Sequence, residues 1–226
     1  MIQPTKQHTD PSQRALLLDF GGVISRTLFE THARTEAALG LPAGSLRWQG
    51  PFAPEQDALW QDMQADRISE RDYWLTRTRE VGRLLGEDWN QMQTLVQRAR
   101  GADVQDILRP EAVAAIHTAR HAGCKLAILS NELDLFYGAD LRQRLPLLQH
   151  FDVIVDATYT EILKPDPRAY QQCLQQLGVQ ARDCVFVDDQ LRNVQGALAL
   201  GLPAVHFDVR APGASFQQAL QLLLAH

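Results

Sequence analysis

Residues 15–22 form the stretch Ala15-Leu16-Leu17-Leu18-Asp19-Phe20-Gly21-Gly22, an apolar run that ends in a carboxylate and two glycines. A continuous apolar run of this length is typical of a strand buried on both faces, as in a parallel sheet. An aspartate at its end places a carboxylate over the sheet edge, and the glycines leave room for the backbone to approach a ligand. The alternative is an ordinary strand-ending turn. Taken alone, the motif does not choose between the two.

Further apolar runs of the same kind follow along the chain. Those that predict strands are 125–130, 151–155, 184–188 and 204–207. The stretches between these runs predict helices over 110–122 and 167–177, over 191–200, and after the last run over 214–224. Alternation at this spacing predicts an α/β fold with a doubly wound parallel-sheet, Rossmann-like core.

One interval is too long for this alternation. About 105 residues separate the first strand from the second, whereas a strand–helix–strand crossover needs roughly 30. The excess shows helical patterns and holds all four tryptophans. Open α/β sheets bind ligands at the carboxyl ends of their strands, so an insertion there predicts an α-helical cap domain. The expected domains are a disordered arm over 1–13, a core over 14–24 and 106–226, and a cap over 25–105.

Composition excludes several classes of protein. Of the 226 residues, 45% are hydrophobic and 22% charged, which is globular usage rather than disordered or collagen-like usage. A net charge of −5 argues against a nucleic-acid binder. No run approaches the roughly 18–20 apolar residues of a membrane span, and the polar start lacks a signal core. Three cysteines suggest neither disulfides nor a metal site, so we expect reduced thiols in a cytoplasmic protein.

Two motifs close strands or precede helices. Ser130-Asn131 ends one predicted strand; it suits either a helix N-cap or an anion site made of a hydroxyl and backbone N–H groups. Lys164 stands in Lys164-Pro165-Asp166-Pro167, where two prolines stiffen the loop. The chain has 19 arginines and only three lysines, so a lysine in a rigid loop favours a point-charge role over a plain surface loop.

The last motif is an acidic pair, Asp188-Asp189, at the end of a buried strand. Adjacent carboxylates repel each other unless a cation neutralises them. One or two carboxylates with several waters are the usual ligands of Mg²⁺. The alternative, a solvated acidic turn, fits this buried position poorly.

Together, these motifs resemble the haloacid dehalogenase superfamily of hydrolases. That family orders a nucleophilic aspartate, a Ser or Thr, a Lys and an acidic pair along the chain, with a helical cap after the first motif. The stretch from Leu59-Trp60 to Trp74 also resembles the cap of the branch that contains glucose-1-phosphate-type phosphatases and the amino-terminal domain of soluble epoxide hydrolases.

The resemblance implies a role for each matching residue. Asp19 would attack phosphorus and form an aspartyl-phosphate. Asp19, Asp189 and the backbone carbonyl of Gly21 would ligate Mg²⁺, with Asp188 as a further ligand or a support behind it. Ser130 and Lys164 would hold the phosphoryl oxygens. Backbone N–H groups after Asp19 (Phe20, Gly21 and Gly22) and after Ser130 (Asn131) would add donors.

The sequence departs from the family at Gly21, where most of its phosphatases carry an acid/base aspartate. Such a group typically contributes about 10²–10⁴-fold to the rate. Three interpretations compete: a phosphatase for good leaving groups, a metal-independent 2-haloacid dehalogenase, or a catalytically weak member that binds a phosphorylated ligand. Glu132 or Glu161 could substitute for the missing carboxyl. The acidic pair favours the first interpretation, because dehalogenation needs no metal.

The expected partner is a small phosphorylated metabolite, with no nucleic acid and no membrane, and the protein is expected to be a monomer or homodimer. Four cap residues are candidates for substrate contact: Arg26, Arg47, Trp48 and Trp60. For the tryptophans, filling the core of a small domain is the stronger interpretation.

Overall fold

A computed structural model describes residues 10–100 and 104–225. The greater part of the predicted arm, residues 1–9, lies outside the described residues, while Pro11–Gln13 form one helical turn capped by Asp10. The described chain divides into two compact units. The first comprises the chain up to Ser25, Arg109–Asn131 and the chain from Pro146 onwards; the second comprises Arg26–Leu108 and Glu132–Leu145.

The first unit is built on a sheet whose strands all run parallel. Within the described residues these strands are β1 (Ala15–Leu18), β2 (Lys125–Ser130), β3 (Val153–Asp156), β4 (Cys184–Asp188) and β5 (Ala204–His206). Their order across the sheet is β3-β2-β1-β4-β5. The first strand of the chain is therefore the central one, and the predicted α/β fold with a parallel, Rossmann-like sheet is confirmed.

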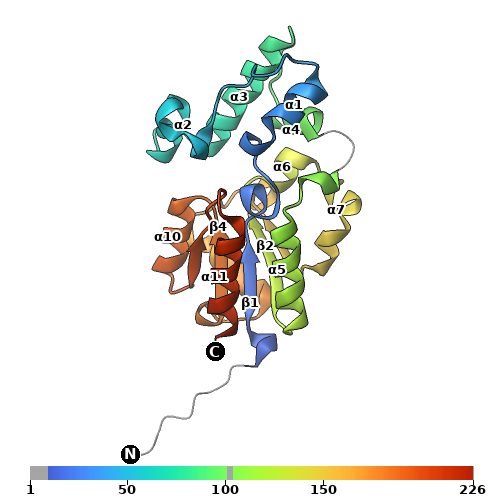
Figure 1. Cartoon of the computed structure of the whole chain (residues 1–226). Helices are drawn as coiled ribbons and strands as arrows, with labels where there is room; N and C mark the ends of the chain where they lie inside the picture. The colour runs from blue at the N-terminus through green and yellow to red at the C-terminus, as the bar shows by residue number, and fades with distance from the viewer. Residues whose placement is uncertain (1–9, 101–103, 226) are drawn as a thin grey trace, which may run out of the picture. The chain divides into compact units, whose positions relative to one another are not determined.

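Helices cover both faces of this sheet, which explains why its strands are apolar without alternation. The helices of this unit are α5 (Pro110–His121), α8 (Ala157–Thr160), α9 (Pro167–Leu177), α10 (Leu191–Ala199) and α11 (Pro212–Leu224). Leu17 and Phe186 share one buried cluster with α9 and α10. Figure 1 shows α5 and α11 side by side in front of β1. The three cysteines are buried and unpaired, as predicted, and burial raises the pKa of Cys173 and Cys184 to about 12.

The second unit is helical. It contains α1 (His32–Leu39), α2 (Ala58–Gln64), α3 (Glu70–Leu84), α4 (Met92–Arg100), α6 (Leu133–Tyr137) and α7 (Leu141–Arg144). Ser69 begins α3 with a capping box, in which its hydroxyl accepts from the Asp72 N–H and the Asp72 carboxylate accepts from the Ser69 N–H. Among the described residues, none of the helices combines the length and the apolar character needed to span a membrane.

The division into units differs from the expected domain boundaries at Ser25 and 106–108, which fall in the other unit, and in one longer segment. Residues 132–145, which hold α6 and α7, pack with the helical unit although they follow strand β2 of the sheet. Trp74 on α3 illustrates this packing, because its ring contacts that of Phe136 on α6 at a centroid distance of 6.0 Å. The chain therefore enters the helical unit twice.

Candidate active site

Two carboxylate motifs meet at the point where the sheet changes winding direction. Asp19 follows β1, and Asp188-Asp189 end the neighbouring strand β4, with Leu18 paired in register with Val187. The chain continues from β1 to β2 on one side and from β4 to β5 on the other. In open α/β sheets, this switch point is where ligands bind.

A tight turn follows Asp19. Gly21 has φ −70° and ψ 122°, and Gly22 has φ 80° and ψ −25°, which are the central angles of a type II turn. The second central position needs a positive φ, and glycine adopts it at no steric cost, so the sequence places Gly22 where the turn demands it. The Ser25 N–H donates to the Phe20 carbonyl at 2.9 Å and closes the loop. The strand-ending turn that the motif predicts is therefore present directly after Asp19.

Lys164 joins the two carboxylate motifs. Its Nζ lies 2.8 Å from Oδ1 of Asp19 and 2.6 Å from Oδ2 of Asp188. Burial opposes the charge of this lysine, but the carboxylates of Asp188 and Asp19 outweigh that effect and raise the pKa of the ammonium. The ring of Phe186 lies beneath it, with the centroid 5.4 Å from Nζ. Lys164 is therefore a fixed positive charge at the switch point.

Asp188 is the most enclosed carboxylate of the site, and its side chain is inaccessible to solvent. Oδ1 accepts from the Gln190 N–H at 2.8 Å and from Asn193 Nδ2 at 3.1 Å, while Oδ2 accepts from Lys164 and Asn193. Its neighbour Asp189 is only half-buried. This arrangement suits Asp188 to orienting Lys164 and leaves Asp189 as the more accessible member of the pair.

The loop that carries Lys164 is clamped by Asn131. The Lys164 N–H donates to Asn131 Oδ1 at 2.7 Å, and Asn131 Nδ2 donates to the Lys164 carbonyl at 3.1 Å. The Asn131 side chain therefore positions the Lys164 loop, and the predicted phosphate contact of its backbone N–H stays a prediction. Ser130, at the end of β2, is buried and lies at the same sheet edge as Asp19.

The three aspartates satisfy the requirements of a divalent cation. One carboxylate oxygen each of Asp19, Asp188 and Asp189 lie within 4.8 Å of one another. The three carboxylates outnumber the ammonium of Lys164, which pairs with two of them. Oxygen ligands with this charge suit Mg²⁺. The residues present thus fit the metal that the motifs predict.

The structure brings together most of the predicted site residues and shows others that sequence reasoning missed. Asp19, Lys164 and the acidic pair converge, with Phe20, Gly21 and Gly22 in the adjoining turn. Asn193, which holds both oxygens of Asp188, was assigned no role from the sequence. Its position five residues after Asp188, in the first turn of α10, was the available signal, because that turn can fold back onto the strand end.

The two suggested replacements for the missing acid/base carboxyl lie in different surroundings. Oε1 of Glu132 accepts from Nε of Arg71 at 2.7 Å within the helical unit. Glu161 follows α8 in the sheet unit, is exposed, and has a positive φ of 56°. Neither position identifies the residue that would replace the acid/base carboxyl.

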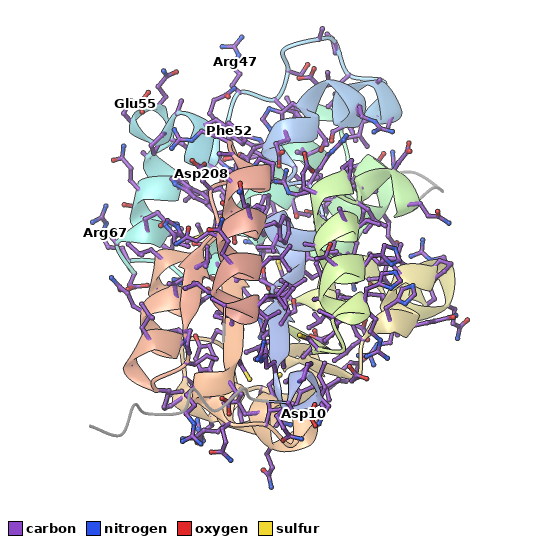
Figure 2. All side chains as sticks on the ribbon, turned by 60° about the horizontal axis from the view of Figure 1, so that its bottom comes forward. Asp10, Arg47, Phe52, Glu55, Arg67 and Asp208 are labelled. Carbon is purple, nitrogen blue, oxygen red and sulfur yellow. The ribbon has the colours of Figure 1, made fainter. Side chains whose placement is uncertain are left out.

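Three of the four cap tryptophans form part of an aromatic cluster inside the helical unit. The ring of Phe29 lies at its centre, with centroid distances of 5.4 Å to Trp48, 5.3 Å to Trp60 and 5.4 Å to Trp74. These contacts support the interpretation that the tryptophans fill the core of this unit. Arg47, by contrast, is exposed and points outward from the ribbon (Figure 2).

Comparisons with known proteins place the chain in a family. A family model described as haloacid dehalogenase-like hydrolase matches residues 13–201. The chain is 36% identical over 99 residues to Phosphatase MT3486 of Mycobacterium tuberculosis, which covers 44% of this chain and 46% of that protein. It is 27% identical over 168 residues to (S)-2-haloacid dehalogenase 1 of a Pseudomonas species, which covers 70% of this chain and 73% of that one. The chain thus spans less than half the length of the phosphatase.

A solved structure repeats the fold over nearly the whole chain. The magnesium-bound crystal structure of YfnB from Bacillus subtilis superposes with a TM-score of 0.67 at 17% identity, covering 93% of this chain and 98% of that one. At this identity the likeness concerns the fold alone. The family model, which spans the sheet strands from β1 to β4 and all the motif residues, carries the assignment. The protein belongs to the haloacid dehalogenase-like hydrolases.

Proposed function

We propose that the protein is a Mg²⁺-dependent hydrolase of small phosphomonoesters that forms an aspartyl-phosphate on Asp19. One observation carries the proposal: one carboxylate oxygen each of Asp19, Asp188 and Asp189 lies within 4.8 Å of the others, and Lys164 pairs with Asp19 and Asp188. A site for a divalent cation is useful in phosphoryl transfer, where negative charge spreads over the phosphoryl oxygens. It has no evident use in halide displacement from carbon.

The reaction divides into two displacements at phosphorus. A carboxylate oxygen of Asp19 forms a bond to phosphorus as the bond to the leaving alcohol oxygen breaks, and that oxygen takes a proton from solvent. Water then attacks the same phosphorus, and the bond to Asp19 breaks, which releases inorganic phosphate and restores the carboxylate. Splitting hydrolysis in this way replaces one difficult step with two easier ones.

The other residues position Asp19 and the phosphoryl group and neutralise the negative charge of that group. Lys164 holds Oδ1 of Asp19 and supplies a positive charge to the phosphoryl group, while the hydroxyl of Ser130 donates to a phosphoryl oxygen. Asp19, Asp189 and the Gly21 carbonyl would hold Mg²⁺, which supplies further neutralisation of phosphoryl charge when bound. Asp188 keeps Lys164 charged and in place.

Gly21 limits the substrates. Without a carboxyl at this position, the leaving group receives little protonation from the turn. Substrates whose leaving groups have a low pKa, such as anomeric, aryl or acyl phosphates, need less protonation and are the proposed class. The partner is thus a small phosphorylated metabolite with a good leaving group. The cap is proposed to select it, as lids do by closing over a site and excluding water.

The test measures p-nitrophenyl phosphate hydrolysis with Mg²⁺ and with EDTA, in the wild type and in Asp19→Asn. Asp208→Asn serves as the matched control, because Asp208 lies in the same unit with an exposed side chain. We expect turnover that needs Mg²⁺, is lost in Asp19→Asn and persists in Asp208→Asn. Metal-independent hydrolysis, or unchanged hydrolysis in Asp19→Asn, would overturn the proposal.

A second candidate function is 2-haloacid dehalogenation, favoured by the absence of a carboxyl at Gly21 and by the resemblance to (S)-2-haloacid dehalogenase 1. A parallel assay of chloride release from 2-chloropropionate in the presence of EDTA separates the two functions. Chloride release without phosphatase turnover would favour dehalogenation. Binding of phosphate without either reaction would identify a non-catalytic member of the family.

A further inference from the structure

Arg109 is a buried arginine at the point where the chain returns to the sheet unit, directly before α5. Only 3% of its surface is exposed. Its Nε donates to the Gly22 carbonyl at 2.9 Å, and its backbone N–H donates to the Ile24 carbonyl at 3.0 Å. Arg109 therefore binds the turn that follows Asp19 at two points.

The orientation of the Gly22 carbonyl is coupled to that of the Gly21 carbonyl. The peptide group just before Gly22 carries the Gly21 carbonyl, the proposed backbone ligand of Mg²⁺. Only φ and ψ of Gly22 separate that group from the carbonyl that Arg109 holds. Because glycine is the least restricted of all residues, these two angles need an external restraint. The hydrogen bond from Arg109 supplies it.

On its other side, Arg109 lies against the strand next to the acidic pair. Its guanidinium carbon is 5.5 Å from the ring centroid of Phe207, which is itself buried. The Phe207 N–H donates to the Asp188 carbonyl at 2.9 Å. Arg109 thus links the turn after β1 to Phe207, which follows β5 and is in turn hydrogen-bonded to the end of β4.

We propose that Arg109 is a positioning residue for this site: it fixes the turn after Asp19 relative to the Asp188-Asp189 strand and so sets the affinity for Mg²⁺. The inference rests on the proposed function, because it concerns the same metal. Groups that orient metal ligands typically change metal affinity by about 10–100-fold when they are removed.

The helical unit provides a matched control. There, Arg100 donates from Nη2 to the Arg26 carbonyl, in the segment where the chain enters that unit. Arg100→Met and Arg109→Met each remove an arginine that holds a carbonyl of a connecting segment. Only Arg109 touches the turn next to Asp19.

The experiment titrates Mg²⁺ against the melting temperature of the intact protein, without substrate, for wild type, Arg109→Met, Arg109→Lys and Arg100→Met. We expect Arg109→Met to raise the Mg²⁺ dissociation constant by about tenfold or more, and Arg100→Met to leave it unchanged. Arg109→Lys, which keeps a donor but loses the planar stack on Phe207, should fall between them. At saturating Mg²⁺, p-nitrophenyl phosphate turnover by Arg109→Lys should recover most of the wild-type kcat.

The outcomes separate the two proposals. If wild type binds Mg²⁺ and both Arg109 variants bind it within about twofold of wild type, the positioning role is wrong while the proposed function stands. If Arg109→Met does not fold, Arg109→Lys and Phe207→Leu test the positioning role instead. Each weakens the contact between Arg109 and Phe207, and both should weaken Mg²⁺ binding. If wild type shows neither Mg²⁺ binding nor phosphatase turnover, the proposed function fails and this inference fails with it.

Discussion

Lys164 and Asp188 form an ion pair, Nζ to Oδ2 at 2.6 Å, between side chains that are 2% and 0% exposed. Desolvation makes such a pair expensive, so its presence adds little to stability by comparison with an apolar pair. Removing one partner is strongly destabilising, because the remaining charge stays buried without its partner. The pair therefore ties the integrity of the sheet unit to the residues of the candidate site.

Lys164→Met is accordingly expected to lower both stability and activity. The buried carboxylate of Asp188 loses its cation, which should lower the free energy of unfolding by about 3–5 kcal/mol. Loss of the charge at the phosphoryl group should lower kcat by at least about 10²-fold. Urea unfolding and p-nitrophenyl phosphate turnover measure the two effects.

Lys125→Met is the control for that variant. Lys125 Nζ donates to the Leu177 carbonyl at 2.7 Å and takes no part in the site. Its loss should cost about 1 kcal/mol and leave kcat unchanged. Equal destabilisation by the two lysine substitutions would contradict the account of a buried ion pair.

Gly21→Asp should broaden the range of leaving groups. The nearest described atom to an added Cβ is Asp19 Oδ2 at 4.0 Å, and the φ and ψ of Gly21 suit any residue, so the side chain fits without strain. An added acid should accelerate hydrolysis of alkyl phosphates by about tenfold or more and change p-nitrophenyl phosphate little. The measurement is the dependence of kcat/KM on leaving-group pKa. A flat dependence in the wild type would contradict the argument.

Gly22→Ala, one residue on, should behave in the opposite way. The φ of 80° is strained for any residue with a Cβ, and the carbonyl of Gly22 is held by Arg109. We expect a loss of about 1–2 kcal/mol in stability and a marked fall in kcat for every substrate. The comparison variant is Gly21→Ala, which should be tolerated. If Gly22→Ala were tolerated equally well, the positive φ of the type II turn would not be the reason for a glycine at position 22.

Gly196→Ala tests how α10 supports the Lys164 loop. An added Cβ would lie 2.8 Å from Pro165 Cβ and 3.0 Å from the Tyr170 hydroxyl, which donates to the Asn193 carbonyl at 2.7 Å. Overpacking of this kind costs about 1–3 kcal/mol. Displacement of Pro165 should also lower kcat, because Lys164 precedes it directly.

Gly213→Ala supplies the comparison. Gly213 lies in α11. Apart from its chain neighbours and the nearby backbone of the helix itself, no heavy atom of the described residues lies within 4 Å of an added Cβ. The substitution should be neutral or stabilising by up to about 1 kcal/mol, as alanine favours a helix. Thermal unfolding and kcat of the two variants side by side would decide whether close packing at Gly196 matters.

Local patterns were sufficient to predict the sheet and the motif positions. Continuous apolar runs identify strands buried on both faces, and parallel strands bring their carboxyl ends to one edge. The convergence of Asp19, Lys164 and the acidic pair follows from that geometry. The turn itself was visible at Gly22, since its second central position requires a positive φ that favours glycine.

Contacts between distant segments could not be predicted. The side-chain amide of Asn131 holds the Lys164 backbone 33 residues away, a pairing that no local pattern encodes. Residues 132–145 follow a core strand yet pack with the helical unit, because tertiary contacts rather than sequence order decide membership. Arg109 carries no signal in a single sequence; its role is visible only once the Gly22 carbonyl is placed.

His32 should make the helical unit sensitive to acid. Its ring packs against Trp48 at a centroid distance of 4.3 Å, and its Nε2 is buried without a hydrogen-bond partner among the described residues. Burial lowers the pKa of this imidazole below its ordinary value, a shift that Glu36 opposes and Arg77 reinforces. The folded protein therefore holds His32 neutral at a pH where the unfolded chain has begun to bind a proton.

The direction of the effect follows from that difference. Stability from neutral His32 is complete above the unfolded pKa of about 6.5 and is lost as the pH falls below it toward the folded value. We expect the melting temperature to fall between about pH 7 and pH 5, and to fall less in His32→Asn. His121→Asn, which replaces an exposed imidazole on α5, should keep the wild-type profile. Calorimetry across this range would contradict the assignment if His32→Asn and wild type lost stability in parallel, because the proton uptake would then occur elsewhere.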